Sequence, residues 1–262
     1  MKIYFTSIKG RRQSNEDSHN IILNKSLNNN FKINLLSIYD GHGGDKISNF
    51  LKNNIPLLYC NTKLKYPLTR KYHIKIFDFL QKRIISGKYG YLQGSTCLLN
   101  ILYRYNNDIY MNILNLGDCR LTIVNKNDTY EQITIDHKPD DKIEAKRIND
   151  IGGEIYKDSE GVYRIGNLSL SRAFGDGDNA PYISHVPDIY TIKITKQNEF
   201  IVMACDGLWD VIENNELYKL LKEYQTKKIV NYASKLATEA LERGSTDNIS
   251  IIILELDNID LV

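Results

Sequence analysis

Four aspartates stand next to strongly apolar segments of the sequence, where carboxylates could hold a metal ion. They are Asp40, Asp118, Asp206 and Asp247. A single aspartate that ends a strand before a glycine is common turn chemistry. Four of them, each beside a predicted strand, indicate something more, because strand ends in a stack of sheets converge. We therefore expect these carboxylates to lie close together at one end of the fold.

Carboxylates that converge repel one another unless a cation lies among them. The set consists of hard oxygen ligands without an accompanying His/Cys set, which favours Mg²⁺ or Mn²⁺ over zinc. Glycine follows both Asp40 and Asp206, and a residue without Cβ lets the backbone approach an ion, so a carbonyl ligand is also expected. The sequence thus predicts one shared metal site.

The composition indicates a globular protein and excludes several classes of function. The chain has 262 residues, of which 42% are apolar and 25% are charged, and its formal net charge is only +2. No strongly basic total or block supports nucleic-acid binding. The longest apolar run, Ile249–Leu256, is far shorter than the roughly 20 residues that span a bilayer. We therefore expect neither a nucleic-acid partner nor a membrane partner. The protein is also expected to be a monomer.

The cysteines and the N-terminus predict an intracellular protein. Cys60, Cys97, Cys119 and Cys205 are scattered, without a CxxC pair or a zinc-ligand spacing. Buried reduced thiols in apolar surroundings are the expected state, which points to a reducing compartment. Charged residues from Lys9 onward interrupt the N-terminal apolar segment too early for a secretory leader. The expected location is the cytoplasm, with the nucleus also open.

Segments rich in β-branched and aromatic residues dominate the pattern and predict eight strands. They are Lys2–Ile8, Lys32–Tyr39, Ser95–Tyr103, Ile109–Leu116, Arg120–Asn125, Ile189–Thr195, Phe200–Cys205 and Asn248–Leu256. Near-continuous apolar stretches among them indicate strands that are covered on both faces.

Helical periodicity occurs in separate segments between these strands. Thr226–Leu241 carries one apolar stripe before Gly244, and Asp140–Ile151 has a cap at its start and two glycines after it. Weaker patterns predict helices at Asp45–Leu51 and His73–Ile85. Runs of strands with helices inserted between them predict packed sheets covered by helices.

The motifs that contain these acidic residues resemble those of the protein phosphatase 2C family, the metal-dependent protein serine/threonine phosphatases. Eight matching segments occur in family order along essentially the whole chain. They are Arg12-Gln13-Ser14-Asn15-Glu16-Asp17, Asp40-Gly41-His42-Gly43-Gly44, Gly94-Ser95-Thr96, Gly117-Asp118-Cys119-Arg120 (with Cys in place of the family's Ser), Asp136-His137-Lys138-Pro139, Leu170-Ser171-Arg172-Ala173-Phe174-Gly175-Asp176, Ala204-Cys205-Asp206-Gly207-Leu208-Trp209-Asp210 and Ser245-Thr246-Asp247-Asn248.

The resemblance implies an α+β fold: a central β-sandwich of two antiparallel sheets flanked by helices, in α-β-β-α order. The whole chain, 1–262, would be a single catalytic domain with a flap-like insertion at about 151–186. The segment Gly175-Asp176-Gly177-Asp178-Asn179 lacks the lysine that family members often carry soon after Gly-Asp. This departure leaves the substrate preference open and the implied metal chemistry intact.

The resemblance also implies roles for individual residues. Asp40 would bridge two metal ions, Gly41 would bind one through its carbonyl, and Asp206 and Asp247 would complete the ligands of the other. Glu16 and Asp17 would hold metal-bound waters, and Asp118 with Asp206 and Asp210 matches positions that hold a weaker third metal in some members. Arg12 would grip the substrate phosphate, since its spacing to Asn15-Glu16-Asp17 fits better than that of Arg11. His42 is the candidate general acid.

These roles fit the chemistry of phosphate-ester hydrolysis. Two Mg²⁺ or Mn²⁺ ions about 3.5–4 Å apart activate a bridging water and clamp the transferring group. A guanidinium adds bidentate recognition of phosphate, and a histidine donates a proton near neutral pH. Two simpler interpretations stay open, in which His42 only structures its glycine-rich turn and Arg12 is an ordinary surface cation. Trp209 is expected to pack in the core, and Lys63–Tyr72 to form a solvated connection.

The expected activity is hydrolysis of phosphoserine and phosphothreonine in proteins. The alternative is a catalytically weak regulatory module of the same fold that binds a phosphoprotein or a kinase; the intact Arg12, Asp40, Asp206 and Asp247 argue against it. Other dinuclear metallophosphatases, cysteine-dependent phosphatases and kinases are excluded because their motifs are missing. Assigning seven acids and one arginine to one pocket leaves the rest of the chain basic, which would attract an acidic phosphoprotein.

Overall fold

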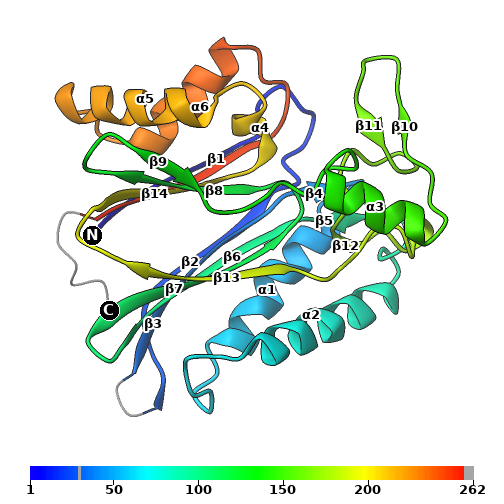
Figure 1. The fold of residues 1–262 in the computed structure, drawn as a ribbon, viewed down its shortest axis with the longest axis horizontal. Coiled ribbons are helices and arrows are strands. Elements are labelled where there is room, and N and C mark those ends of the chain that lie inside the picture. Colours follow the sequence, from blue (N-terminus) through cyan, green and yellow to red (C-terminus); the bar gives the residue numbers. More distant parts are fainter. Residues whose placement is uncertain (29–30, 257–262) are drawn as a thin grey trace.

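Two five-stranded antiparallel sheets pack face to face and carry helices on their outer faces (Figure 1). The computed structural model describes residues 1–28 and 31–256. The strand order is β1-β15-β14-β8-β9 in one sheet and β13-β7-β6-β3-β2 in the other. The expected α-β-β-α sandwich is therefore confirmed.

The first sheet joins the two ends of the described chain. Lys2 pairs with Glu255 and Ile8 with Ile249, so β1 and β15 are hydrogen-bonded along their whole length. The strands of this sheet are β1 (Lys2–Ile8), β15 (Ile249–Glu255), β14 (Asn198–Ala204), β8 (Arg120–Asn125) and β9 (Tyr130–Gln132).

The second sheet is built from neighbouring hairpins. Its strands are β13 (Asp188–Ile194), β7 (Asp108–Leu116), β6 (Cys97–Tyr105), β3 (Lys32–Tyr39) and β2 (Ser18–Ser26). A small third sheet lies at one end of the sandwich, in the order β12-β5-β4, and each of its strands has two residues. These strands are β12 (Phe174–Gly175), β5 (Gly94–Ser95) and β4 (Gly41–His42).

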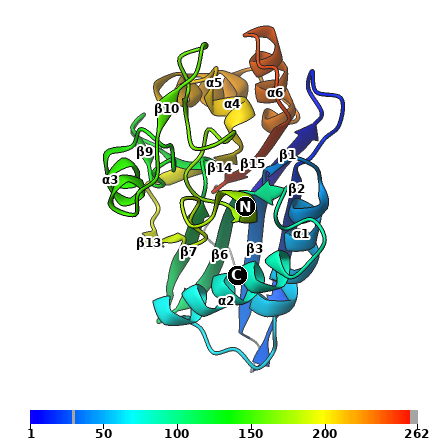
Figure 2. The same ribbon diagram turned by 90° about the vertical axis from the view of Figure 1, so that its right-hand side faces the viewer.

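The helices other than α3 form two outer layers, which Figures 1 and 2 show on opposite faces of the sandwich. On the second sheet lie α1 (Lys46–Tyr59) and α2 (Arg70–Ile85), and on the first lie α4 (Asp206–Trp209), α5 (Asn214–Thr226) and α6 (Tyr232–Glu242). No helix of the described residues has the length and apolarity to cross a membrane.

Three apolar cores hold these layers together, because the central strands bury both faces. In β3, for example, Leu36 and Ile38 face the other sheet while Leu35 and Tyr39 face the helices. Trp209 packs in the core under α5 and α6, as expected, and its Nε1 donates to the Ala204 carbonyl at 3.0 Å.

A fourth, smaller core lies beside the sandwich, between the helix α3 (Lys142–Asp150) and the segment that follows it. That segment contains the hairpin β10 (Tyr156–Lys157) and β11 (Tyr163–Arg164), which projects from the body of the molecule, and the short 3₁₀ turn η2 (Gly177–Asn179) (Figure 1). It corresponds to the flap-like segment expected at 151–186.

The predicted strands agree with the structure to within one or two residues at each end, whereas two helix predictions had wrong bounds. The helix expected at Asp45–Leu51 continues to Tyr59 as α1. The segment Thr226–Leu241 is not one helix: α5 ends at Thr226 and α6 begins at Tyr232. Lys228 between them has a positive φ of 53°, and the side chain of Asn231 caps α6 by accepting from the Ser234 amide. The apolar stripe does not reveal this break. The polar Asn231 within it caps the start of a new helix.

Candidate metal centre

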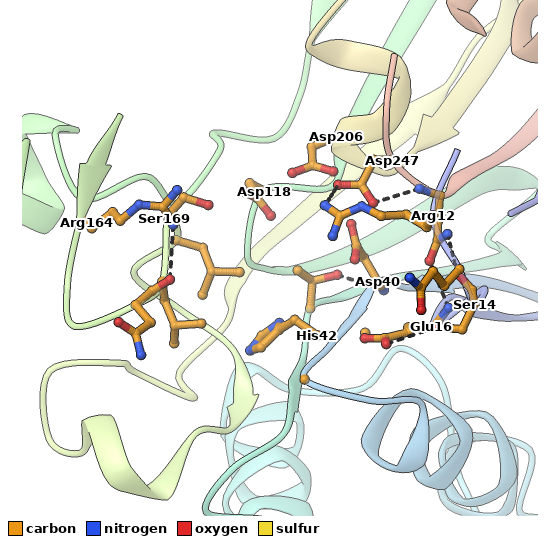
Figure 3. A pocket seen from close by; sticks show the side chains of 18 residues that line it. Arg12, Ser14, Glu16, Asp40, His42, Asp118, Arg164, Ser169, Asp206 and Asp247 are labelled. Atoms are coloured by element: carbon orange, nitrogen blue, oxygen red, sulfur yellow. Dashed lines mark hydrogen bonds and ion pairs between the residues drawn. The ribbon is translucent and has the colours of Figure 1, made fainter. Parts of the chain in front are cut away.

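The predicted site residues gather around one pocket of about 510 Å³ at the end of the sandwich (Figure 3). Asp40 follows β3 of one sheet, whereas Asp206 follows β14 and Asp247 precedes β15 of the other. The pocket therefore spans the boundary between the two sheets. Eight of the ten predicted site residues line it: Arg12, Glu16, Asp40, Gly41, His42, Asp118, Asp206 and Asp247.

Asp40 is held by Thr96 of the Gly94-Ser95-Thr96 motif. Its amide donates to the Thr96 hydroxyl at 3.1 Å, and its carbonyl accepts from the Thr96 amide at 2.8 Å. A Cβ on the next residue, Gly41, would lie only 2.4 Å from the Glu16 carbonyl oxygen. Any side chain at this position would push the Asn15-Glu16-Asp17 segment away from Asp40.

Asp206 and Asp247 are brought together by a second close backbone contact. A Cβ on Gly207 would lie 2.0 Å from the carbonyl oxygen of Asn248, so only glycine lets the two segments approach. Ser245 adds a hydrogen bond from its hydroxyl to the Gly207 carbonyl at 2.7 Å. The structure thus adds a reason for glycine at Gly41 and Gly207, which is the close approach of one chain segment to another.

The carboxylates are costly to keep charged without a cation. Burial raises the pKa of Asp40 well above its ordinary value, and the charges of Asp17, Asp206 and Asp118 raise it further. Burial likewise raises the pKa of Asp206, again with help from Asp118. This half-buried cluster of oxygen donors fits divalent cations, which would remove the repulsion.

Two predicted residues, Asp17 and Asp210, are not among those that line the pocket. Burial raises the pKa of Asp17 to about 6, while Oδ2 accepts from the Ser250 hydroxyl at 2.6 Å and Oδ1 has no hydrogen-bond partner. Asp17, Asp40 and Cys205 each offer one ligand atom within 4.8 Å of the others. Asp210 caps the C-terminal end of α4, and its charge contributes to the raised pKa of Asp206.

Glu16 is tied to the glycine-rich turn. Its Oε2 accepts from the Gly44 amide at 2.9 Å, and its own amide donates to Oδ1 of Asn248 at 2.8 Å. These contacts connect the N-terminal motif to both the Asp40 turn and the residue directly before β15.

Lys138 is a cation that lies among these acids. It was not among the predicted site residues. Its ammonium donates to Oδ2 of Asp118 and lies 3.9 Å from Oδ2 of Asp206. Burial alone lowers the pKa of Lys138, but Asp118 and Asp206 outweigh this effect and raise it above the ordinary value. The motif Asp136-His137-Lys138-Pro139 was a signal, but only the fold places its lysine beside Asp118.

Arg12 lies at the open side of the pocket. Its Nη2 donates to Oδ2 of Asp247 at 2.6 Å, and 58% of its side chain is exposed. Arg11 donates instead to the Leu241 carbonyl at 3.3 Å and does not line the pocket. Of the two neighbouring arginines, Arg12 is therefore the one that faces the acids.

His42 forms part of the pocket wall and is paired with a residue that the sequence did not single out. Its Nε2 lies 2.9 Å and 2.8 Å from the two carboxylate oxygens of Asp176. The side chain of Asp176 is buried, and 24% of the His42 side chain is exposed.

The flap-like segment contributes the side of the pocket opposite Arg12, where Figure 3 shows Arg164 and Ser169. Arg164 is held by Oδ2 of Asp158 at 2.6 Å and by the carbonyl of Asn167 at 3.0 Å. Arg164 and Ser169 were not predicted as site residues because they belong to none of the motifs and reach the pocket only through the fold of the segment. The flap residues that line the pocket are Arg164, Asn167, Leu168, Ser169 and Leu170.

Solved structures share this fold. A structure described as a C. elegans sex determining protein matches with a TM-score of 0.82 and 25% identity, over 96% of this chain and 64% of that one. A phosphatase from Toxoplasma gondii also gives a TM-score of 0.82, with 21% identity over 98% of this chain and 94% of that one.

Sequence relatives agree with the fold. A probable protein phosphatase 2C 7 from Oryza sativa subsp. japonica is 32% identical over 97% of this chain and 66% of its own length, and the probable protein phosphatase 2C 30 of Arabidopsis thaliana is 30% identical over 95% and 65%. A PP2C-like domain-containing protein of Acanthamoeba polyphaga mimivirus is 39% identical over 54% of this chain and 92% of that protein. The chain thus spans about two thirds of the length of these two plant relatives. The family profile described as protein phosphatase 2C matches residues 1–249, and the chain belongs to the protein phosphatase 2C family.

Proposed function

We propose that this chain hydrolyses phosphoserine and phosphothreonine in proteins with the help of bound Mg²⁺ or Mn²⁺. The observation that carries the proposal is the half-buried carboxylate cluster of Asp40, Asp206 and Asp247, with Arg12 at its open side. A pocket with acids at its base and a guanidinium at its mouth suits a phosphate that is bound through cations on one side and an arginine on the other. Phosphatase names among the relatives support the same activity.

Each acid has a proposed task in holding cations. Asp40, the carbonyl of Gly41, Asp206 and Asp247 would bind two ions, and Glu16 and Asp17 would hold waters on them. Asp118, with Asp206 and Asp210, would hold a weaker third ion, for which the ammonium of Lys138 competes. When bound, two such ions supply an activated water nucleophile and neutralise charge on the phosphoryl oxygens.

Arg12 and His42 would act on the substrate directly. The guanidinium of Arg12 already binds a carboxylate oxygen at 2.6 Å, and the same donors fit two oxygens of a phosphate. His42 would give a proton to the seryl or threonyl oxygen as the bond to phosphorus breaks.

The proposal extends to the form in which the protein works. We propose that residues 1–262 act as one catalytic domain, as a monomer, on phosphoprotein partners whose acidic surfaces are attracted to the basic remainder of the chain. The four cysteines are free thiols, three of them buried, which suits a reducing compartment such as the cytoplasm.

The test is hydrolysis of a phosphoserine peptide with Mn²⁺, Mg²⁺ or EDTA, by the wild type and by Asp206→Asn. We expect activity with either ion, loss on chelation, and a decrease of at least about 100-fold in the variant. Asp150→Asn is the matched control, because Asp150 is exposed on α3 and its carboxylate pairs with the exposed Lys146. Activity that survives EDTA or Asp206→Asn would overturn the metal mechanism. A folded protein inactive with both ions would favour the regulatory module instead.

A further inference from the structure

A buried carboxylate holds the imidazole of His42 from behind the pocket wall. Both oxygens of Asp176 lie within 2.9 Å of Nε2, although the two residues are 134 positions apart. Only 3% of Asp176 is exposed. Figure 3 shows His42 among the side chains that line the pocket.

The small sheet β12-β5-β4 builds this pair. His42 ends β4, which pairs with Gly94 of β5, and Gly94 pairs on its other side with Gly175 of β12, directly before Asp176. A Cβ on Gly94 would lie 2.2 Å from Oδ2 of Asp176 and 2.3 Å from Nε2 of His42. The absence of a side chain at Gly94 therefore provides the space in which the two groups meet.

The backbone at Asp176 is fixed in an unusual conformation. Its φ of 52° lies in the left-handed region, which costs energy for most residues and is tolerated best by Asn and Asp. The side chain of Gln81 clamps the preceding residue, because its amide group accepts from the Gly175 amide and donates to the Gly175 carbonyl, both at 2.9 Å. The surrounding contacts thus hold the carboxylate in place against this cost.

We propose that Asp176 is a positioning residue that fixes the ring orientation and the tautomer of His42. A carboxylate only accepts hydrogen bonds, so Nε2 must carry a proton, and Nδ1 is the nitrogen left for the substrate. Among the described residues, no hydrogen bond to Nδ1 occurs. The inference rests on the proposed phosphatase function and names the atom through which His42 acts in it.

The proton balance of the step follows from this assignment. As the bond between phosphorus and the seryl oxygen breaks, its electron pair stays on that oxygen, which takes the proton from Nδ1 of the doubly protonated ring. The ring is left neutral with its Nε2 proton still held by Asp176. The attacking water gives its oxygen to the phosphoryl group and releases one proton. Reprotonation of Nδ1 takes up one proton, so the complete step is balanced.

A second histidine pair in the chain provides a contrast. Nε2 of His137 lies 3.3 Å from Oδ2 of Asp188, but its Nδ1 accepts from the Gly117 amide at 3.0 Å. Both nitrogens of this buried ring are used inside the protein, so it has no atom for a substrate. His137–Asp188 is therefore the matched structural pair, with the same two groups and no access to the pocket.

The kinetic test compares a phosphoserine peptide with p-nitrophenyl phosphate in Asp176→Asn. An Asn keeps the shape and tolerates the left-handed backbone, but turns at least one N–H toward Nε2. We expect kcat for the peptide to fall about 10- to 100-fold, and kcat for p-nitrophenyl phosphate by much less, because p-nitrophenolate leaves without a proton. In a His42→Gln background the same change should have no further effect on the peptide.

Asp188→Asn is the control, and it should lower the two activities in equal proportion if it lowers them at all. Equal losses with both substrates in Asp176→Asn, or a full further loss in the His42→Gln background, would overturn the inference.

A second measurement decides the inference without activity. ¹⁵N spectra of the histidine side chains, with His42 assigned by comparison with His42→Gln, report which nitrogen carries the proton in the neutral ring. We expect Nε2–H in the wild type and a shift toward Nδ1–H in Asp176→Asn. A wild-type His42 with the proton on Nδ1 would overturn the inference, whereas absence of hydrolysis by the wild type would overturn only the proposed function.

Discussion

The guanidinium of Arg12 lies 2.6 Å from a carboxylate oxygen of Asp247, so the proposed phosphate-binding group is bonded to a proposed metal ligand. Burial lowers the pKa of Arg12, but the charge of Asp247 and the hydrogen bond to it raise the value overall. Arg12 thus links the two parts of the pocket, the acids at its base and the opening through which a phosphate would enter.

Replacement of Arg12 should weaken substrate binding. We expect Arg12→Ala to lower kcat/KM for a phosphoserine peptide by roughly 10- to 100-fold, mainly through KM, because a charge-assisted bidentate contact is lost. Arg12→Lys should recover little of it, since an ammonium does not provide the planar fork. Steady-state kinetics with Arg11→Ala as the neighbouring control will check this; equal effects at the two positions would contradict it.

Asp206→Asn should stabilise the metal-free protein while it removes activity. Because burial and neighbouring acids raise the pKa of Asp206, its charge at pH 7 opposes folding. We expect the free energy of unfolding in EDTA to rise by roughly 1–3 kcal/mol. Saturating Mn²⁺ should reverse the order of the two proteins. Urea unfolding with and without Mn²⁺ measures both effects, and a variant less stable than the wild type in EDTA would contradict the prediction.

Removal of the Lys138 ammonium should make the stability of the protein depend more strongly on added cations. Lys138→Met leaves Asp118 buried without its partner, which we expect to cost about 3 kcal/mol of stability in EDTA. Mn²⁺ should then restore more stability than in the wild type, and calorimetry should detect tighter binding of a further ion. Lys146→Met, which breaks only an exposed pair with Asp150, is the control and should change stability by less than about 0.5 kcal/mol. Identical Mn²⁺ titrations of wild type and Lys138→Met would contradict the prediction.

Glu144 should give the fold a defined acid sensitivity. Burial alone raises the pKa of this carboxylate, but hydrogen bonds from Arg172 and Arg147 outweigh it and lower the pKa to about 2. A lowered folded-state pKa stabilises the protein above the unfolded value of 4.5, and this contribution is lost as the pH falls toward 2. It amounts to roughly 3 kcal/mol at neutral pH.

The measurement for Glu144 is urea unfolding of the wild type and Glu144→Gln between pH 7 and pH 3. The stability difference between the two should stay constant from pH 7 to about pH 5 and narrow below it. Glu160→Gln, in an exposed turn of the flap, is the control and should show no such narrowing. A difference that is independent of pH down to pH 3 would show that Glu144 acts by shape alone.

The sequence predicted the apolar strands well because burial on both faces leaves a continuous signal. Lys2–Ile8, Lys32–Tyr39 and Arg120–Asn125 were predicted with the bounds that they have. The strand β2 (Ser18–Ser26) was missed because it is an edge strand with exposed polar residues in its second half. Its pairing with β3, rather than its own composition, makes it a strand.

Some features of the site could likewise be predicted from the sequence, and others could not. Motifs identified acids such as Asp40 and Asp206, and the structure brings them to one pocket. Contacts between distant segments were not readable in advance: Asp176 reaches His42 only because three two-residue strands pair beside the sandwich. The role of Lys138 depends likewise on where its ammonium lies and not on its residue type.

The position of the pocket across the boundary between the sheets has a consequence for motion. Ions held by Asp40 from one sheet and by Asp206 and Asp247 from the other would connect the two sheets at a place where no strand crosses. Separation of the sheets would then require release of the ions. Amide hydrogen exchange in the central strands β3, β14 and β15 should therefore slow when Mn²⁺ is added.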